Sequence, residues 1–222
     1  MALDVTTKDC TALSDSELAE MADICAEGGH CYEVGELSKQ VDLWVLVTLV
    51  REGNHLRGFS FSTLERIGGT PCILLGVASV KRTSKRDSVL RAIIGDNFRR
   101  ALMAFPDEDV LLGTRLSDAG AFDGFKQLSD VIPRPGHKAS GEERAWGRRL
   151  AKRFGIDSGS YDDQKFTIVG EDCPPLVLDH ESLKPESIDA DVAAQFSHLD
   201  SGRGDCLVAC GWVMAEELLK HG

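Results

Sequence analysis

The fold is decided by residues 72–105, CILLGVASVKRTSKRDSVLRAIIGDNFRRALMAF. Residues 73–80 are apolar at both alternating positions, which is typical of a strand that is buried on both faces. A basic turn follows, and apolar residues then recur at spacings of three and four, as on one face of a helix. These apolar residues are Leu90, Ile94, Phe98, Leu102 and Phe105. The stretch therefore predicts a strand, a turn and a helix that Asp87 or Ser88 caps.

A turn of this kind is a candidate anion site, because free N–H groups and the positive end of the helix dipole both point at it. Seven bases and two acids lie between Lys81 and Arg100, a local charge of +5 in a chain whose net charge is −11. A basic island in an acidic protein predicts local affinity for anions. An exposed helix face that is basic by chance explains the same pattern equally well.

Composition limits the class of protein. The chain has 222 residues, of which 42% are hydrophobic and 27% charged, as in a globular protein of one domain or of one domain with an appendage. No apolar run approaches the roughly 20 residues that span a bilayer. The start, Met1-Ala-Leu-Asp-Val, lacks the pattern of a signal peptide. We therefore expect a cytoplasmic protein that does not bind membranes, and the acidic balance argues against nucleic acid as a partner.

The cysteines indicate thiols rather than disulfides or metal ligands. Seven of them are scattered along the chain, an odd number that suits a reducing compartment. Cys25, His30 and Cys31 lie close together, as do Cys206 and Cys210, but neither group has zinc-finger spacing. We expect no metal site.

The N-terminal third predicts two helices and an antiparallel meander. Ser14 and Glu17 form a capping box that opens a helix ending near residue 27, and a second short helix covers residues 34–38. Strands are expected at residues 43–50 and 55–64, joined to each other and to residues 73–80 by glycine-containing turns.

Beyond the long helix, strands and helices alternate again along the chain. Residues 110–114 form a buried strand, and a right-handed crossover makes it a parallel neighbour of residues 73–80. A short helix capped by Ser117 or Asp118 carries Phe122, and a last strand covers residues 131–132. The remaining expectations are a helix opened by Ser140 and Glu143, a strand at 166–169, a helix at 189–196, a strand at 206–210 and a helix at 214–220.

This order of elements resembles the GCN5-related N-acetyltransferases over residues 14–133, and among them the larger bacterial acetyltransferase-like proteins of unassigned substrate. The resemblance implies an α/β (α+β) fold, with a mixed central sheet flanked by helices. It implies an acetyl-CoA-binding core in residues 1–135 and a C-terminal extension, residues 136–222, packed on the same domain.

The resemblance also implies a site for acetyl-CoA. Strand 73–80 would hydrogen-bond the pantetheine through its backbone, the turn would wrap the pyrophosphate, and strand 110–114 would splay away to open a V-shaped cleft. The implied cofactor-binding residues are Ala78, Val80, Arg82, Lys85, Arg86, Asp87, Ser88 and Val89. We expect the basic side chains among them to be exposed, and the N–H of Val80 to polarise the thioester carbonyl.

Two departures from the family pattern leave the function open. The turn lacks the usual glycines, which let a backbone approach phosphate closely. Phe122 occupies the place of a tyrosine that often protonates the leaving thiolate. The first reading is an acetyltransferase that acts on a small amine or a protein amino group, and the second is a degenerate member that binds CoA or a partner without catalysis. A nucleotide-phosphate enzyme is a third idea, and the chain lacks its glycine-rich loops.

The sequence says less about the site of the acetyl acceptor than about the site of acetyl-CoA. Glu65, His55, Tyr32 and Tyr161 are candidate proton carriers, and the sequence selects none of them as catalytic. Residues 1–42 hold ten acids and two bases, and residues 171–222 hold eleven acids and three bases. One of these segments is expected to form an electronegative region that favours a cationic amine, although a solvated acidic surface explains the same composition. A homodimer also stays open.

Overall fold

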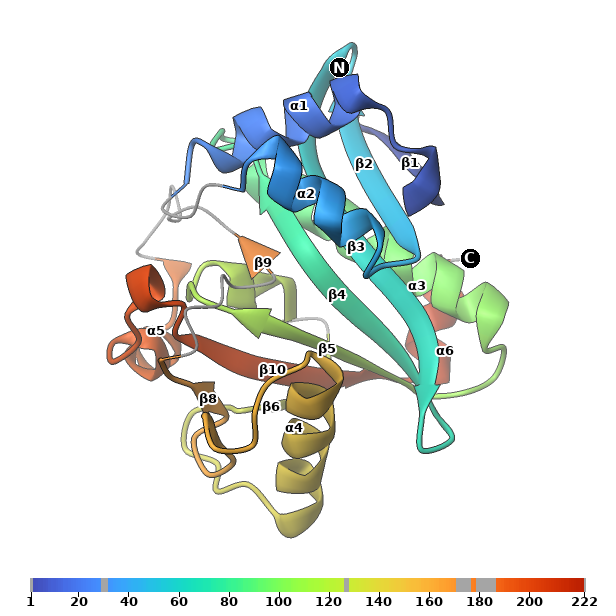
Figure 1. The fold of residues 1–222 in the computed structure, drawn as a ribbon. Helices are drawn as coiled ribbons and strands as arrows, with labels where there is room; N and C mark the ends of the chain where they lie inside the picture. The colour runs from blue at the N-terminus through green and yellow to red at the C-terminus, as the bar shows by residue number, and fades with distance from the viewer. Residues whose placement is uncertain (1, 29–31, 126–127, 171–176, 179–186, 222) are drawn as a thin grey trace.

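One continuous sheet of ten strands forms the centre of the computed structural model, and helices cover both of its faces (Figure 1). The structure describes residues 2–28, 32–125, 128–170, 177–178 and 187–221. The strands are mostly antiparallel, with parallel pairs at the centre. The predicted mixed sheet flanked by helices is confirmed. None of the described helices is both long and apolar enough to cross a membrane.

The chain begins with a strand that the sequence pattern did not predict. β1 (Asp4–Asp9) pairs antiparallel with β2 (Leu46–Glu52). β1 has charged residues at both ends and no apolar run, so only its β-branched residues mark it as a strand. Its pairing partner lies about 40 residues further along the chain, as in the contact between Thr7 and Thr48.

Two helices follow the 3-10 turn η1 (Cys10–Ala12). α1 (Asp15–Cys25) begins at the predicted capping box, in which the Ser14 hydroxyl accepts from the Glu17 N–H and the Glu17 carboxylate accepts from the Ser14 N–H. α2 (Val34–Val41) confirms the second predicted helix.

The predicted meander is confirmed by β2, β3 (His55–Ile67) and β4 (Thr70–Val80), which pair antiparallel in sequence order. β2 begins three residues later than predicted. The reason is that the N–H groups of Leu43 and Trp44 donate to the Gln40 carbonyl, so these residues continue the end of α2.

β4 carries a bulge near its middle. Ser60 of β3 lies opposite Ala78, and Ser62 lies opposite Leu75, so β3 advances two residues while β4 advances three. The extra residue falls at Gly76 or the residue after it, and a bulge of this kind bends the strand and increases its twist.

The stretch that decides the fold has the expected form. β4 leads through a short turn into α3 (Arg86–Ala104), and β5 (Val110–Leu116) then runs parallel to β4, with Leu74 opposite Gly113. The predicted parallel neighbours are therefore confirmed. The buried side chains of α3 include three members of the predicted stripe, Leu90, Ile94 and Phe98.

The C-terminal part of the chain enters the same sheet. β10 (Cys206–Val213) pairs antiparallel with β5 from Leu207 to Val213. The helix predicted after Thr114 is the 3-10 turn η2 (Ala121–Phe125), and β6 (Ser129–Ile132) pairs with β10. α4 (Gly141–Arg153) begins at the second predicted capping box.

The other described elements are short. They are β7 (Tyr161–Asp162), β8 (Thr167–Ile168), β9 (Val177–Leu178), α5 (Ala190–Phe196), η4 (Ser201–Arg203), α6 (Ala215–Leu218) and η5 (Leu219–His221). The strand order is β1-β2-β3-β4-β9-β5-β10-β8-β7, with β6 beside β10.

One face of the sheet, which we call the front face, carries α1, α2 and α4, and α3 lies behind the sheet (Figure 1). The indole of Trp44 covers Gly76 of β4, and Leu150 of α4 covers Gly113 of β5. Because Gly113 lies opposite Leu74, two residues from Gly76, both glycines lack side chains toward the same face. α4 and the end of α2 therefore flank one stretch of the sheet.

The change Gly76→Ala tests the cover on this stretch. The new Cβ would lie 2.4 Å from Cε2 of Trp44, so the ring or the strand must shift. We expect the free energy of unfolding to fall by about 1–3 kcal/mol, as for an overpacked core. Urea unfolding measures it. The control Gly35→Ala in α2 adds a methyl group with no atom within 4 Å, and its free energy of unfolding should rise by up to about 1 kcal/mol. Equal stability of both variants would contradict the close packing of Trp44 on Gly76.

The capping box of α1 predicts a pH dependence. Burial alone would raise the pKa of Glu17, but hydrogen bonds from Lys8 and Ser14 outweigh it and lower this pKa from 4.5 to about 2. Because the folded pKa is the lower one, Glu17 stabilises the fold above about pH 4.5, and this contribution is lost as the pH falls toward 2.

We expect the stability difference between the wild type and Glu17→Gln to be largest near neutral pH and to vanish at the acid end of that window. Urea unfolding at a series of pH values measures it. A difference that stays constant down to the acid limit would show that the Glu17 charge contributes nothing.

Candidate functional site

The turn after β4 starts α3 earlier than predicted. The Thr83 hydroxyl accepts from the Lys85 N–H at 3.2 Å, and the Thr83 carbonyl accepts from the Arg86 N–H at 3.0 Å. Lys85 is therefore the N-cap residue, and the prediction that Asp87 or Ser88 caps the helix was wrong. Both of these residues lie in the first turn of α3, where N–H groups have no acceptor within the helix.

Acids from other elements hold two bases of this turn. The Lys81 ammonium lies 2.9 Å from a carboxylate oxygen of Glu27, just beyond α1. The Lys85 ammonium pairs with Glu52 at the end of β2, and Arg57 approaches the same carboxylate at 3.0 Å. The basic island counted along the sequence is thus partly neutralised inside the fold.

Arg86 does not lie where the sequence suggested. Its side chain is 2% exposed, so the prediction of an exposed Arg86 was wrong. Nη2 donates to the Gly120 carbonyl at 2.9 Å, and Nη1 pairs with the carboxylate of Asp87. The physical reason is that the segment between β5 and η2 returns to the start of α3 and buries the guanidinium.

The other predicted cofactor residues divide between surface and core. Arg82 and Ser88 are exposed at the turn and the first helical turn. Val80 and Val89 are each 1% exposed and pack in one small cluster behind the sheet. Ala78 is 3% exposed and pairs with Ser60 of β3.

β4 and β5 part directly after their parallel contact. The Thr114 hydroxyl donates to the Leu75 carbonyl at 3.1 Å, one residue beyond the last paired position on each strand. The bulge of β4 begins at the next residue, Gly76. We call the gap beyond this point the split.

β9 lies in the split. Val177 and Leu178 pair parallel with Ala78 and Ser79 of β4, and Val177 also pairs with Leu116 of β5. In this structure the edge of β4 that faces the split is therefore engaged by the chain itself. No periodic pattern marked these two residues, because a two-residue strand has no period.

The residues considered for proton transfer lie in different places, and several of them are buried or paired with other side chains. Glu65 accepts from Arg153 at 2.6 Å, and His55 is exposed at the start of β3. Phe122 is 8% exposed and stacks on Phe125 with ring centroids 5.8 Å apart. Burial raises the pKa of Tyr161 strongly. The structure does not bring these residues together in one site.

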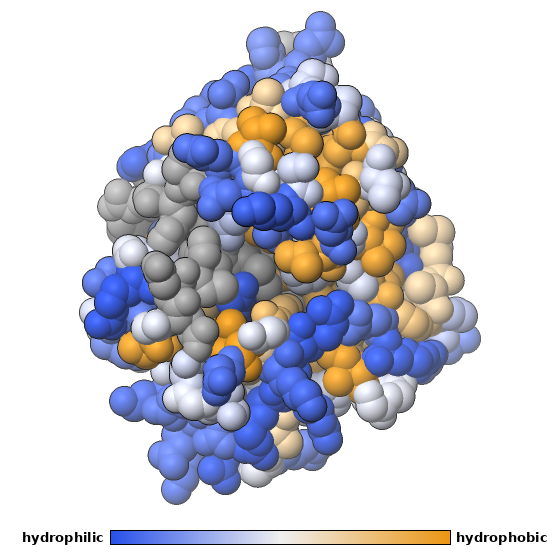
Figure 2. All heavy atoms as spheres, in the orientation of Figure 1, coloured by the Kyte–Doolittle hydropathy of each residue, from blue (hydrophilic) through white to orange (hydrophobic). Residues whose placement is uncertain are grey.

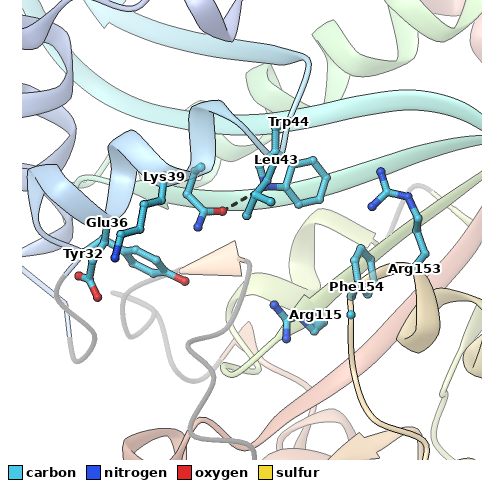
Figure 3. A pocket seen from close by; sticks show the side chains of 10 residues that line it. Tyr32, Glu36, Lys39, Leu43, Trp44, Arg115, Arg153 and Phe154 are labelled. Carbon is cyan, nitrogen blue, oxygen red and sulfur yellow. Dashed lines mark hydrogen bonds between the residues drawn. The ribbon is translucent and has the colours of Figure 1, made fainter.

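The front face carries a pocket of about 440 Å³ between α2, the segment just before β2, the end of β5 and the end of α4 (Figure 3). Its chemically distinctive lining residues are Tyr32, Glu36, Lys39, Trp44, Arg115, Arg153 and Phe154. We call it the front pocket. Figure 2 shows apolar surface beneath α2 on this face and hydrophilic residues along its lower side.

The front pocket adjoins the split. Arg115 follows Thr114 directly along β5, and Trp44 covers Gly76 at the bulge. The sequence analysis did not combine these residues, because they come from three separate segments of the chain, residues 32–44, 115 and 153–155. Tyr32 was considered and not selected; it is 5% exposed in the pocket wall.

The described lining of the front pocket is not acidic, and the expected electronegative acceptor surface stays a prediction. Three bases and one acid line it, although residues 1–42 are strongly acidic. Within the described residues no group of three His, Cys, Asp or Glu side chains is placed to hold a metal, and His30 and Cys31 lie outside them.

Replacement of the buried guanidinium, Arg86→Ala, should lower the free energy of unfolding by about 2–3 kcal/mol, because a charge-assisted bond is lost and the Gly120 carbonyl loses its donor. Lys81→Ala removes an exposed ion pair and should cost less than about 1 kcal/mol. Urea unfolding of both variants measures the contrast, and equal losses would mean that Arg86 does not hold the start of α3.

Comparisons with known proteins concern the fold. The sequence matches no protein-family model and no curated protein. Among solved structures it is similar to the ribosomal-protein-S18-alanine N-acetyltransferase from Escherichia coli, with 12% identity over 63% of this chain and 86% of that chain and a TM-score of 0.43. The ribosomal-protein-alanine N-acetyltransferase from Brucella melitensis biovar Abortus 2308 shows 16% identity over 50% and 79%, with a TM-score of 0.39.

A chain of the NatC complex bound to Gag peptide and CoA shows 12% identity over 65% of this chain and 90% of that chain, with a TM-score of 0.44. The order and direction of the strands define the fold: an antiparallel meander leads to β4, α3 crosses behind the sheet, and β5 runs parallel to β4 before leaving it. In these features the chain has the fold that the sequence analysis expected.

Proposed function

We propose that the protein is an acetyl-CoA-dependent N-acetyltransferase that transfers an acetyl group to an amine. The observation that carries the proposal is the split: β4 and β5 run parallel through Leu74 and Gly113 and then part, with the start of α3 at the mouth. Such a gap, once β9 leaves it, offers backbone groups to a ligand and has a helix N-terminus beside them.

The chain has groups that fit acetyl-CoA on the α3 side. The amides of Asp87 and Ser88 in the first turn, with the side chains of Arg82 and Lys85, would hold the pyrophosphate. The backbone of β4 would hold the pantetheine arm. Acetyl-CoA, when bound, supplies the acetyl group as a thioester.

In this proposal the N–H of Val80 polarises the thioester carbonyl. The Lys81 N–H donates to the Arg57 carbonyl on β3 at 2.8 Å, and successive N–H groups of a strand alternate in direction. The N–H of Val80 therefore points toward the split, where a donor would stabilise the negative charge that develops on the thioester oxygen.

The transfer needs a neutral amine and a destination for one proton. The amine nitrogen bonds to the thioester carbon, the carbon–sulfur bond breaks, and the amine proton passes to the thiolate. Phe122 cannot donate a proton, so this transfer is direct or runs through water. No described side chain is assigned as the general base.

A second candidate is a degenerate member that binds a partner or CoA without catalysis. The observation that favours it is β9, which pairs with the same edge of β4 that the pantetheine would use. The two functions differ in whether β9 leaves the split. An active enzyme requires that it does.

The variant Val177→Pro separates the two candidates. β9 has strands on both sides, and proline cannot donate a ladder hydrogen bond, so the change weakens its hold on the split. Calorimetric titration should show that Val177→Pro binds acetyl-CoA about tenfold more tightly than the wild type. The matched control Val177→Thr keeps both the β-branch and the N–H, and it should bind as the wild type does.

Release of CoA in the presence of a panel of amines completes the test. Acetyl-CoA-dependent thiol release that is faster in Val177→Pro supports the enzyme. No binding of millimolar acetyl-CoA by any of the three proteins would refute it and leave the degenerate candidate.

A further inference from the structure

The front pocket has a charge opposite to that of the chain. The protein carries a net charge of −11, yet Lys39 and Arg115 line this pocket beside Glu36, the one acid of its described lining, and Arg153 lines it while paired with Glu65. A concave site with one sign of charge concentrates ligands of the other sign. Its volume of about 440 Å³ lies within the range of small-molecule sites, about 300–1,000 Å³.

Arg115 is the deepest of these bases. It is 4% exposed, and its guanidinium carbon lies 5.7 Å from the centre of the Phe154 ring. A guanidinium held over an aromatic face has a fixed plane and presents its N–H groups as a fork, which suits a carboxylate. Figure 3 shows the Arg115 side chain below α2, between Lys39 and Phe154.

The walls around these charges are aromatic. Trp44 is 8% exposed and its indole N–H donates to Gln40 at 3.1 Å, which holds the ring in place. Tyr32 and Phe154 complete the aromatic lining, and Leu43 adds an aliphatic side chain. A ligand with both an apolar body and one negative charge matches this combination.

We infer that the front pocket takes the acetyl acceptor, and that this acceptor is an amine with an apolar or aromatic body and a carboxylate, the chemistry of an apolar α-amino acid. The inference rests on the proposed function. Arg115 and Lys39 bind the carboxylate, and the amine faces the split beside Thr114. Its nitrogen bonds to the thioester carbon, CoA leaves as the thiol with the amine proton, and the product is the N-acetyl amino acid.

The test begins without acetyl-CoA, so it does not depend on catalysis. The probes are N-acetyl-L-phenylalanine and N-acetyl-L-phenylalaninamide, which differ in the carboxylate alone, and binding is measured by NMR titration. We expect the wild type to bind the acid about tenfold more tightly than the amide. Equal binding of the two probes, or binding of neither, would overturn the inference.

Three variants locate the site. Lys39→Gln changes an exposed side chain and should lose most of the preference without a change in stability. Arg115→Gln should lose it entirely, and its unfolding temperature is recorded because the side chain is buried. The control Arg148→Gln removes an exposed base of α4 that pairs with Asp163 outside the pocket, and it should keep the preference. Loss in the control as well, or retention in Lys39→Gln and in folded Arg115→Gln, would contradict the assignment.

A second arm separates this inference from the proposed function. Acetyl transfer from acetyl-CoA is measured on L-phenylalanine and on L-phenylalaninamide. Preferred acetylation of the amino acid supports both proposals, and equal acetylation of both amines supports the enzyme and overturns the inference. Selective binding of the acid probe with no transfer to any amine sustains the carboxylate site and refutes the enzyme.

Discussion

The short parallel contact between β4 and β5 is the constraint on which the rest of the structure depends. Three residues of each strand pair, and the Thr114 hydroxyl then closes the contact on the Leu75 carbonyl. Beyond this contact β5 does not depend on β4 for its hydrogen bonds, because β10 pairs with β5 from Val110 to Leu116. The C-terminal extension therefore holds one wall of the split, and the bulge of β4 bends the other wall away.

This division gives the two faces of the sheet different chemistry. Behind the sheet, α3 presents its N-terminus and a turn whose bases are partly held by Glu27 and Glu52. On the front face, α2 and α4 enclose an aromatic pocket lined by bases, in a protein that is acidic as a whole. β9 lies between the two, in the split. Under the proposed function, acetyl-CoA binds only when β9 leaves the split.

Local signals predicted most of the fold. The two capping boxes located α1 and α4, the glycine turns produced the meander, and the handedness of crossovers made β4 and β5 parallel neighbours. β1 was missed because six polar and β-branched residues become a strand only when β2 is present to pair with them. The start of β2 was misplaced because Leu43 and Trp44 bond back to α2 rather than to a strand.

The sequence by itself determined where helices and strands form and where positive charge gathers, because caps, turns and periodicity act within about one turn or one hairpin. The tertiary structure alone decided what those groups do. It buried Arg86 through Gly120, 34 positions away, and it placed Val177 beside Ala78 in the split. It also assembled the front pocket from segments between residues 32 and 155. Contacts over such separations leave no periodic trace in a single sequence, since each partner is an ordinary residue in its own segment.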